Sequence, residues 1–230
     1  MQIKRLILQT SALEKLTDFY IKLMQLPVKK SGVARQSPGV GGHDQKEIAI
    51  TIGSTELVFQ QAKAADPFYH FAINIPANKI EEAKEWLKDR VKLIWMNDYK
   101  SDVADFVTWH AKSVYFYDPA GNILELIARF DLDNQTSEPF SSKQFLSVSE
   151  IGLVFPEKQF DKRIERLIKQ YGLSYFPKQP PLPQFRAVGD DEGLFIIVPE
   201  NRHWFPTSKA SGVFDIQIEG EANGKFCLRL

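Results

Sequence analysis

The sequence has little cysteine and no excess of charge of either sign, and each shortage excludes a class of protein. Its 230 residues include one cysteine, Cys227, which excludes internal disulfides and cysteine-rich metal sites. Lysine plus arginine and aspartate plus glutamate balance at 29 each, so nothing indicates binding to nucleic acid or to an anionic membrane surface. No apolar run is long enough to cross a bilayer. No cleavable secretory signal is visible, so we expect a globular, cytoplasmic protein.

One predicted hairpin places a carboxylate in apolar surroundings. The segment DPAGN at 118–122 has the aspartate, proline and glycine that favour a turn, and it follows the strand-like segment SVYFY at 113–117. The returning segment, ILELI at 123–127, is apolar at every position except Glu125. A strand that is apolar on both faces is covered on both faces, so its charge must be paired, bind a ligand or face a cavity. Glu125 is therefore the first candidate functional residue.

A strand–helix–strands unit recurs along the chain. The first copy starts with a strand at 3–9, continues with a helix capped by Ser11 and ends with strands at 47–52 and 56–60. The second starts with a strand at 69–75 and ends with the hairpin described above. We expect an α+β fold of tandem βαβββ units: residues 1–132 hold two units that form one curved-sheet cleft, 133–149 form a linker, and 150–230 form a third, irregular βαβββ-like unit with an extra C-terminal strand. Small-molecule sites favour such clefts.

Three segments of the sequence resemble the vicinal oxygen chelate superfamily. They are DPAGN with the following LEL at 124–126, YHFAI at 69–73, and the stretch from LEK to DFY at 13–20. This superfamily includes glyoxalase I, extradiol ring-cleavage dioxygenases, fosfomycin-resistance enzymes and bleomycin-binding proteins. The resemblance covers residues 3–129, and WHA at 109–111 is similar to a bacterial branch whose members are labelled glyoxalase or dioxygenase. It implies a small-molecule substrate or ligand bound in a cleft between βαβββ units.

The resemblance also implies metal ligands. In the metal-dependent members, ligands project into the cleft from the first and last strands of each unit, and in the second unit these positions carry His70 and Glu125. The strand pattern agrees, because His70 and Asn74 share one face while Phe71 and Ile73 share the other. An imidazole beside a carboxylate suits a divalent Fe, Mn, Zn, Ni or Co ion.

The first unit departs from the family pattern. Its opening-strand ligand position falls on Arg5, which has no lone pair to offer a metal. Its last-strand position falls on Val58, or on Glu56 if the hairpin is aligned two residues earlier. A third ligand could come from Glu56, Gln9 or His110, or the remaining positions could be filled by water.

Several residues are candidates for substrate contact or catalysis. Arg5 has two interpretations: it binds a substrate carboxylate or phosphate, or it pairs directly with Glu125. His110, which precedes the hairpin strand, is a candidate proton shuttle near neutral pH, and Glu125 is the other catalytic candidate. The candidates for substrate contact are Arg5, Gln9, Asn74, Trp109 and Tyr115.

Two functions remain open from the sequence. In the first, a divalent metal acts as a Lewis acid on two adjacent substrate oxygens, for isomerisation of a thiol adduct by a lyase or isomerase, or for extradiol ring cleavage. In the second, the cleft binds a small molecule without metal, as in drug-sequestering, bleomycin-resistance-like members. A lone third unit would expose a sheet, so we expect it to pack on its own strand at 213–219 or to form a homodimer.

Overall fold

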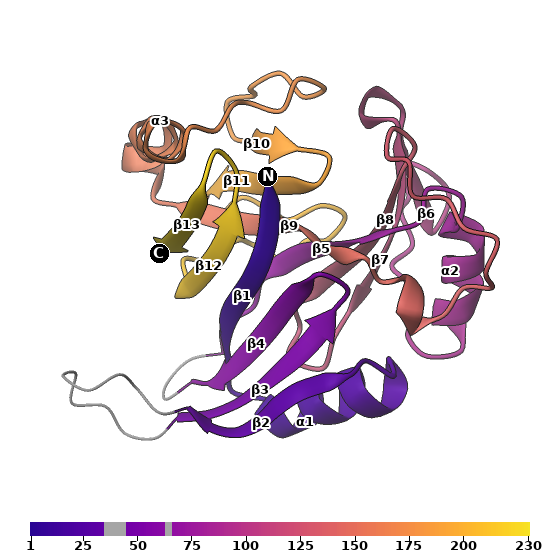
Figure 1. Ribbon diagram of the computed structural model, residues 1–230. Helices are drawn as coiled ribbons and strands as arrows, with labels where there is room; N and C mark the ends of the chain where they lie inside the picture. The colour runs from indigo at the N-terminus through magenta and orange to yellow at the C-terminus, as the bar shows by residue number, and fades with distance from the viewer. Residues whose placement is uncertain (35–44, 63–65) are drawn as a thin grey trace.

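The computed structural model describes residues 1–34, 45–62 and 66–230, whose strands form two twisted sheets (Figure 1). The six-stranded sheet has the order β13-β12-β1-β4-β3-β2, and the seven-stranded sheet has the order β10-β11-β9-β5-β8-β7-β6. The strands are β1 (Gln2–Thr10), β2 (Val28–Ala34), β3 (Gln45–Ile52), β4 (Thr55–Gln61), β5 (His70–Ile75), β6 (Val103–Phe106), β7 (Ala111–Tyr117), β8 (Ile123–Arg129), β9 (Ser147–Phe155), β10 (Arg186–Asp190), β11 (Gly193–Pro199), β12 (Ile216–Glu221) and β13 (Lys225–Arg229). The helices are α1 (Leu13–Asp18), which continues as a π-helical turn (Phe19–Leu23), α2 (Ile80–Lys88) and α3 (Phe160–Tyr171).

The recurring unit is visible in the pairing of the strands. In each unit the opening strand lies parallel to the last one: β1 to β4, β5 to β8, and β9 to β11. Parallel neighbours need a crossover connection, and a helix supplies it in all three units. The third unit has two strands after its helix instead of three, so the expected α+β fold of tandem βαβββ units with an irregular third copy is confirmed.

The units pair differently from the sequence-based expectation. Strand β5 pairs antiparallel with β9, so the second and third units share the seven-stranded sheet, and β1 pairs with β12 instead. The first and second units therefore lie in different sheets, and a boundary near residue 132 falls between two strands of the seven-stranded sheet. The C-terminal strand also leaves its own unit to join the first. The sequence pattern of each unit determines which strands pair within that unit. The free edges of the opening strands offer the same backbone hydrogen-bonding groups, so the pattern does not determine which units pair with each other.

The helices lie on one side of the sheets and enclose a common core. Helix α1 contacts β3 and β4, α2 contacts β7 and β8, and α3 contacts β11. A single cluster of buried apolar side chains joins both sheets to these helices, with Leu16 and Tyr20 from the first helix and Leu87 from the second. Residues 133–146 are part of this packing, because Phe140 and Phe145 are buried against Trp86. None of the helices among the described residues is long and apolar enough to span a membrane.

The turn between β7 and β8 forms as its residues predict. The Asp118 carboxylate accepts hydrogen bonds from the backbone N–H groups of Ala120 and Asn122, and Gly121 has φ of +78°. The Tyr20 hydroxyl donates to the same carboxylate, which ties the turn to the first helix. The predicted cap at Ser11 does not form, because α1 begins at Leu13 with no side-chain cap.

Candidate metal centre and its cavity

One face of the seven-stranded sheet brings an imidazole and two carboxylates together. His70 lies on β5, and Glu125 and Glu150 lie on its two neighbours, β8 and β9. Ala72 of β5 is in register with both glutamates, so they flank the same point of that strand. One ligand atom from each of the three side chains lies within 4.8 Å of the others, and the three residues are only 5%, 2% and 3% exposed.

The geometry of His70 leaves a nitrogen available to a metal. Its Nδ1 is 3.2 Å from the carbonyl oxygen of Ile123, so an Nδ1–H can donate to that carbonyl, and Nε2 is then the unprotonated nitrogen. Nε2 faces the Glu125 carboxylate at 3.7 Å. Burial lowers the pKa of His70 to about 4, so the imidazole is neutral at pH 7. A neutral imidazole oriented by a backbone carbonyl is the usual state of a histidine ligand.

The two carboxylates lack enough positive charge around them. Burial and the nearby charge of Glu150 raise the pKa of Glu125 to about 8, and burial also raises the pKa of Glu150. Buried carboxylates are costly unless a cation or a proton compensates them. Imidazole nitrogen and carboxylate oxygen together suit a divalent ion such as Zn, Mn or Fe, so the donor set fits one. We therefore describe His70, Glu125 and Glu150 as the candidate metal centre.

A fully buried arginine supports this centre from behind. The Arg129 guanidinium pairs with the Glu150 carboxylate, donates to the Asn74 side-chain oxygen at 3.2 Å and contacts Asp191 at 3.3 Å. Lys178 extends the chain of charges, with its ammonium 2.7 Å from the Asp191 carboxylate. Glu150 is therefore held on one side by Arg129, while burial and the charge of Glu150 keep the pKa of Glu125 raised.

A cavity of about 190 Å³ opens beside the candidate metal centre. Three segments form its walls. They are 106–109, from the last residue of β6 to the loop before β7, then 179–185 before β10, and 202–205 after β11. Two contacts hold these segments in place. The Trp109 indole N–H donates to the Gln179 side-chain oxygen at 3.0 Å. The centres of the Trp204 and His70 rings are 5.3 Å apart. Glycine is required at Gly152, because a Cβ there would come within 2.5 Å of the Trp204 ring. The lining residues are His70, Phe106, Thr108, Trp109, Tyr115, Glu125, Glu150, Gln179, Phe185, Ile196, Arg202, Trp204 and Phe205.

Four of the residues singled out from the sequence meet in this cavity: His70, Glu125, Trp109 and Tyr115. Among the others, His110 lies outside it. Its side chain is 60% exposed, and its Nδ1 is 2.6 Å from the Asp131 carboxylate. The structure thus brings His110 next to a surface carboxylate and not to the candidate metal centre.

The candidates from the first unit lie in the other sheet. Arg5 and Gln9 are on β1 and Glu56 is on β4. The Arg5 guanidinium contacts the carboxylates of Glu56 at 2.7 Å and Glu219 at 3.6 Å, so its predicted partner Glu125 is replaced by these two. The Gln9 amide donates to the Gln60 side chain. The structure therefore does not bring Glu56, expected as a third metal ligand, together with His70 and Glu125, because its strand belongs to the six-stranded sheet.

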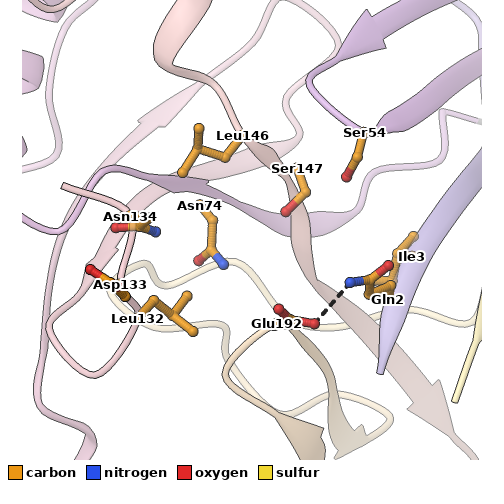
Figure 2. Close-up of a pocket in the computed structure, with 10 residues that line it drawn as sticks. All are labelled: Gln2, Ile3, Ser54, Asn74, Leu132, Asp133, Asn134, Leu146, Ser147 and Glu192. Carbon is orange, nitrogen blue, oxygen red and sulfur yellow. Dashed lines mark hydrogen bonds between the residues drawn. The ribbon is translucent and has the colours of Figure 1, made fainter. Parts of the chain in front are cut away.

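Asn74 lines a different cavity, of about 250 Å³, shown in Figure 2. Ser147, Asn134 and Glu192 line the same space, and the Gln2 amide donates to the Glu192 carboxylate at 2.9 Å. Asn74 reaches the candidate metal centre only through its hydrogen bond from Arg129.

The sequence reasoning missed Glu150 and the segment 202–205. Glu150 was identifiable, because it lies on the opening strand of the third unit, where the family resemblance places ligands. Arg202, Trp204 and Phe205 follow a strand in an irregular loop, where no periodic pattern indicates which way a side chain points.

No family model matches the sequence, and no curated protein matches it. Solved structures do match the fold. A "putative dioxygenase" from Bacillus subtilis aligns over 86% of this chain and 63% of its own, with a TM-score of 0.57 and 18% identity. Glyoxalase I from Zea mays aligns over 91% of this chain and 70% of its own, with a TM-score of 0.54 and 14% identity. This chain therefore spans less than two thirds of the Bacillus protein. The chain has the fold of the vicinal oxygen chelate superfamily, as the sequence resemblance predicted.

Proposed function

We propose that this protein is a divalent-metal-dependent enzyme that acts on a small molecule with two adjacent oxygens. The observation that carries the proposal is the convergence of His70, Glu125 and Glu150 within 4.8 Å in the wall of a cavity. The family resemblance supports it, since ligands on opening and last strands are what the metal-dependent members use. The similar structures named for a dioxygenase and for glyoxalase I support ring cleavage and isomerisation, respectively, as reaction types.

The residues around the centre have separate tasks in this proposal. A bound divalent ion would supply a Lewis acid for two adjacent substrate oxygens. His70, Glu125 and Glu150 would hold the ion, and Arg129 would keep the Glu150 carboxylate turned toward it. Burial and the neighbouring carboxylates raise the pKa of Tyr115 well above its usual value, so its hydroxyl stays protonated and donates a hydrogen bond to the Glu125 carboxylate, which it would hold in place beside the ion. The aromatic walls keep bulk water from the substrate.

A second candidate function has an observation of its own. Arg129 neutralises Glu150 without a metal, and a pKa of about 8 keeps Glu125 mostly protonated at pH 7. The cluster can therefore stay buried with no ion, and the cavity would then serve as a metal-free binding site for an organic ligand. The two candidates differ in whether an ion is needed for the ligand to bind.

Metal analysis of the protein, purified without chelator or nickel affinity, tests the proposal. We expect close to one ion per chain in the wild type after incubation with Fe, Mn, Zn, Ni or Co salts. His70→Ala and Glu125→Gln should each weaken metal binding at least about 100-fold, because each removes one of three ligands. The matched control Glu56→Gln removes a carboxylate from the six-stranded sheet and should bind metal as the wild type does.

Two results would count against the enzyme proposal. If the wild type binds none of the five metals, metal-free ligand binding becomes the better function. If His70→Ala and Glu125→Gln keep full metal affinity, the ion sits elsewhere in the chain.

A homodimer has less physical support than the sequence indicated. The expectation rested on an uncovered third-unit sheet, and β9 of that unit pairs with β5. Light scattering tests whether copies of the chain associate by another surface.

A further inference from the structure

The wall of the cavity carries a positively charged side chain, Arg202, that has no part in the proposed metal chemistry. Arg202, in the segment that follows β11, lines the same cavity as His70, Glu125 and Glu150. Its guanidinium donates to the carbonyl oxygen of His203 at 3.3 Å and lies 5.3 Å from the centre of the Phe185 ring. A guanidinium has five N–H donors, so most of its hydrogen-bonding capacity is unused.

Arg202 differs from two other arginines that are withdrawn from solvent, Arg129 and Arg186. Arg129 is paired with Glu150 and Asp191, and Arg186 is paired with Asp161. In the described ranges no carboxylate lies within 4.0 Å of Arg202, and burial without a compensating charge lowers its pKa. A planar guanidinium with free donors at a cavity wall is suited to binding a carboxylate through two parallel hydrogen bonds.

The other side chains that line the cavity indicate the size and aromatic character of the ligand. Phe106, Trp109, Trp204 and Phe205 surround the cavity with aromatic rings. Its volume of about 190 Å³ is slightly larger than the ~150 Å³ of an apolar protein cavity that takes up benzene. The space therefore fits one aromatic ring with a short substituent, and aromatic rings pack well against such walls.

The charges explain why an anion would enter a cavity that contains two glutamates. Arg129 offsets one of the two carboxylates, and a divalent ion at the candidate metal centre would make the net charge there positive. Arg202 adds another positive charge. An anionic ligand and the metal should therefore increase each other's affinity, as linked ligands do.

We propose that the ligand of this cavity is a small aromatic acid, with a carboxylate bound by Arg202 and adjacent ring oxygens directed to the candidate metal centre. The metal part of this inference rests on the proposed function. The carboxylate part rests on Arg202 alone.

Calorimetric titration with protocatechuate and with catechol, which lacks the carboxylate, tests the inference. With Mn²⁺-loaded protein under anaerobic conditions, we expect protocatechuate to bind at least about 10-fold more tightly than catechol, since hydrogen bonds to charged groups contribute that much or more. Arg202→Gln should weaken protocatechuate binding about 10- to 100-fold and leave catechol binding unchanged. Arg202→Lys keeps the positive charge but loses the paired N–H donors. Its affinity for protocatechuate should therefore lie between those of the wild type and Arg202→Gln.

The chain offers a matched control for Arg202. Arg90 also donates to a backbone carbonyl, that of Trp86, and lies 4.0 Å from the centre of the Trp86 ring, but it does not line the cavity. Arg90→Gln should bind both probes as the wild type does. Circular dichroism checks that each variant is folded, and the wild-type ratio of the two affinities decides the question even if Arg202→Gln does not fold.

The outcomes separate this inference from the proposed function. The inference is overturned if the wild type binds both probes equally, if it binds neither, or if Arg202→Gln weakens both alike. If metal binds but the probes are not distinguished, the metal function stands and the aromatic-acid ligand fails. If no metal binds and protocatechuate still binds through Arg202 in the presence of chelator, the carboxylate site stands and the metal function fails.

Discussion

The two sheets place glutamates in the same way around an opening strand but neutralise them differently. In the six-stranded sheet, Arg5 is in register with Glu56 on one neighbour and Glu219 on the other. In the seven-stranded sheet, Ala72 is in register with Glu125 and Glu150. The side chain between the glutamates is thus a guanidinium in one sheet and a methyl group in the other. One residue on the opening strand therefore decides whether a cation lies between the two glutamates.

The two clusters also differ in how much protein covers them. The Arg5 and Glu219 side chains are 36% and 39% exposed, and among the side chains that the structure describes, a small apolar cluster of Ile7, Ala49 and Val58 lies on that face. The seven-stranded sheet carries a large aromatic cluster on the matching face, including Tyr115 and Trp204, and its glutamates are almost fully buried. The glutamate pair without an arginine between its members is therefore the pair that is covered by protein. Burial there raises the pKa values of Glu125 and Glu150.

Removing the arginine from each cluster should give the largest contrast. Arg129→Met would leave the Glu150 carboxylate buried without its partner, and we expect the free energy of unfolding to fall by about 3–5 kcal/mol. Arg5→Met breaks a partly solvated ion pair, so the expected loss is at most about 1 kcal/mol. Urea unfolding of both variants in the presence of chelator measures the two losses. Equal losses would mean that the two clusters do not differ in solvation as described.

A methyl group added to one glycine in each sheet should affect ligand binding in only one of them. A Cβ at Gly152 would come within 2.5 Å of the Trp204 ring, and one at Gly220 would come within 2.5 Å of the Gln2 carbonyl oxygen. Both Gly→Ala variants should lose about 1–3 kcal/mol of stability through overpacking. Only Gly152→Ala should displace Trp204 and so change protocatechuate affinity and tryptophan fluorescence. A similar change in affinity in Gly220→Ala would argue against a local effect.

The pH dependence of the free energy of unfolding should show that Glu125 retains its proton in the folded, metal-free protein. Glu125 has a pKa of about 8 when folded and about 4.5 when unfolded, so the folded protein retains a proton that the unfolded chain has released. Stability in chelator should therefore fall as pH rises, by at most about 2 kcal/mol between pH 6.5 and 8. The pKa values of His70, about 4, and Asp118, about 6, place their effects at lower pH.

Glu125→Gln should remove most of this fall, and Glu56→Gln should keep it. Urea unfolding at several pH values measures the slope for each variant. A wild-type slope that is flat or of opposite sign would show that Glu125 is ionised in the metal-free protein.

The parts of the site that could be predicted are those on regular strands. Glu125 stood out because it interrupts an apolar strand, and His70 because the family resemblance places a ligand on the opening strand, with which strand alternation agrees. The turn at 118–122 formed as its residues required. Glu150 follows the same rule, on the opening strand of the third unit. Arg202 and Trp204 could not have been found this way, since a loop has no fixed period and only contacts with distant strands orient its side chains.

The sequence by itself determined the repeated βαβββ unit, its turns and the buried glutamate of the second unit. These features depend on strand alternation, on turn chemistry and on pairing within one unit, such as the parallel pairing of its first and last strands. Only the tertiary structure decided which units share a sheet, and hence that Glu150 and not Glu56 lies beside Glu125. That choice is made by free strand edges with similar hydrogen-bonding groups, and it is settled by how the whole core packs.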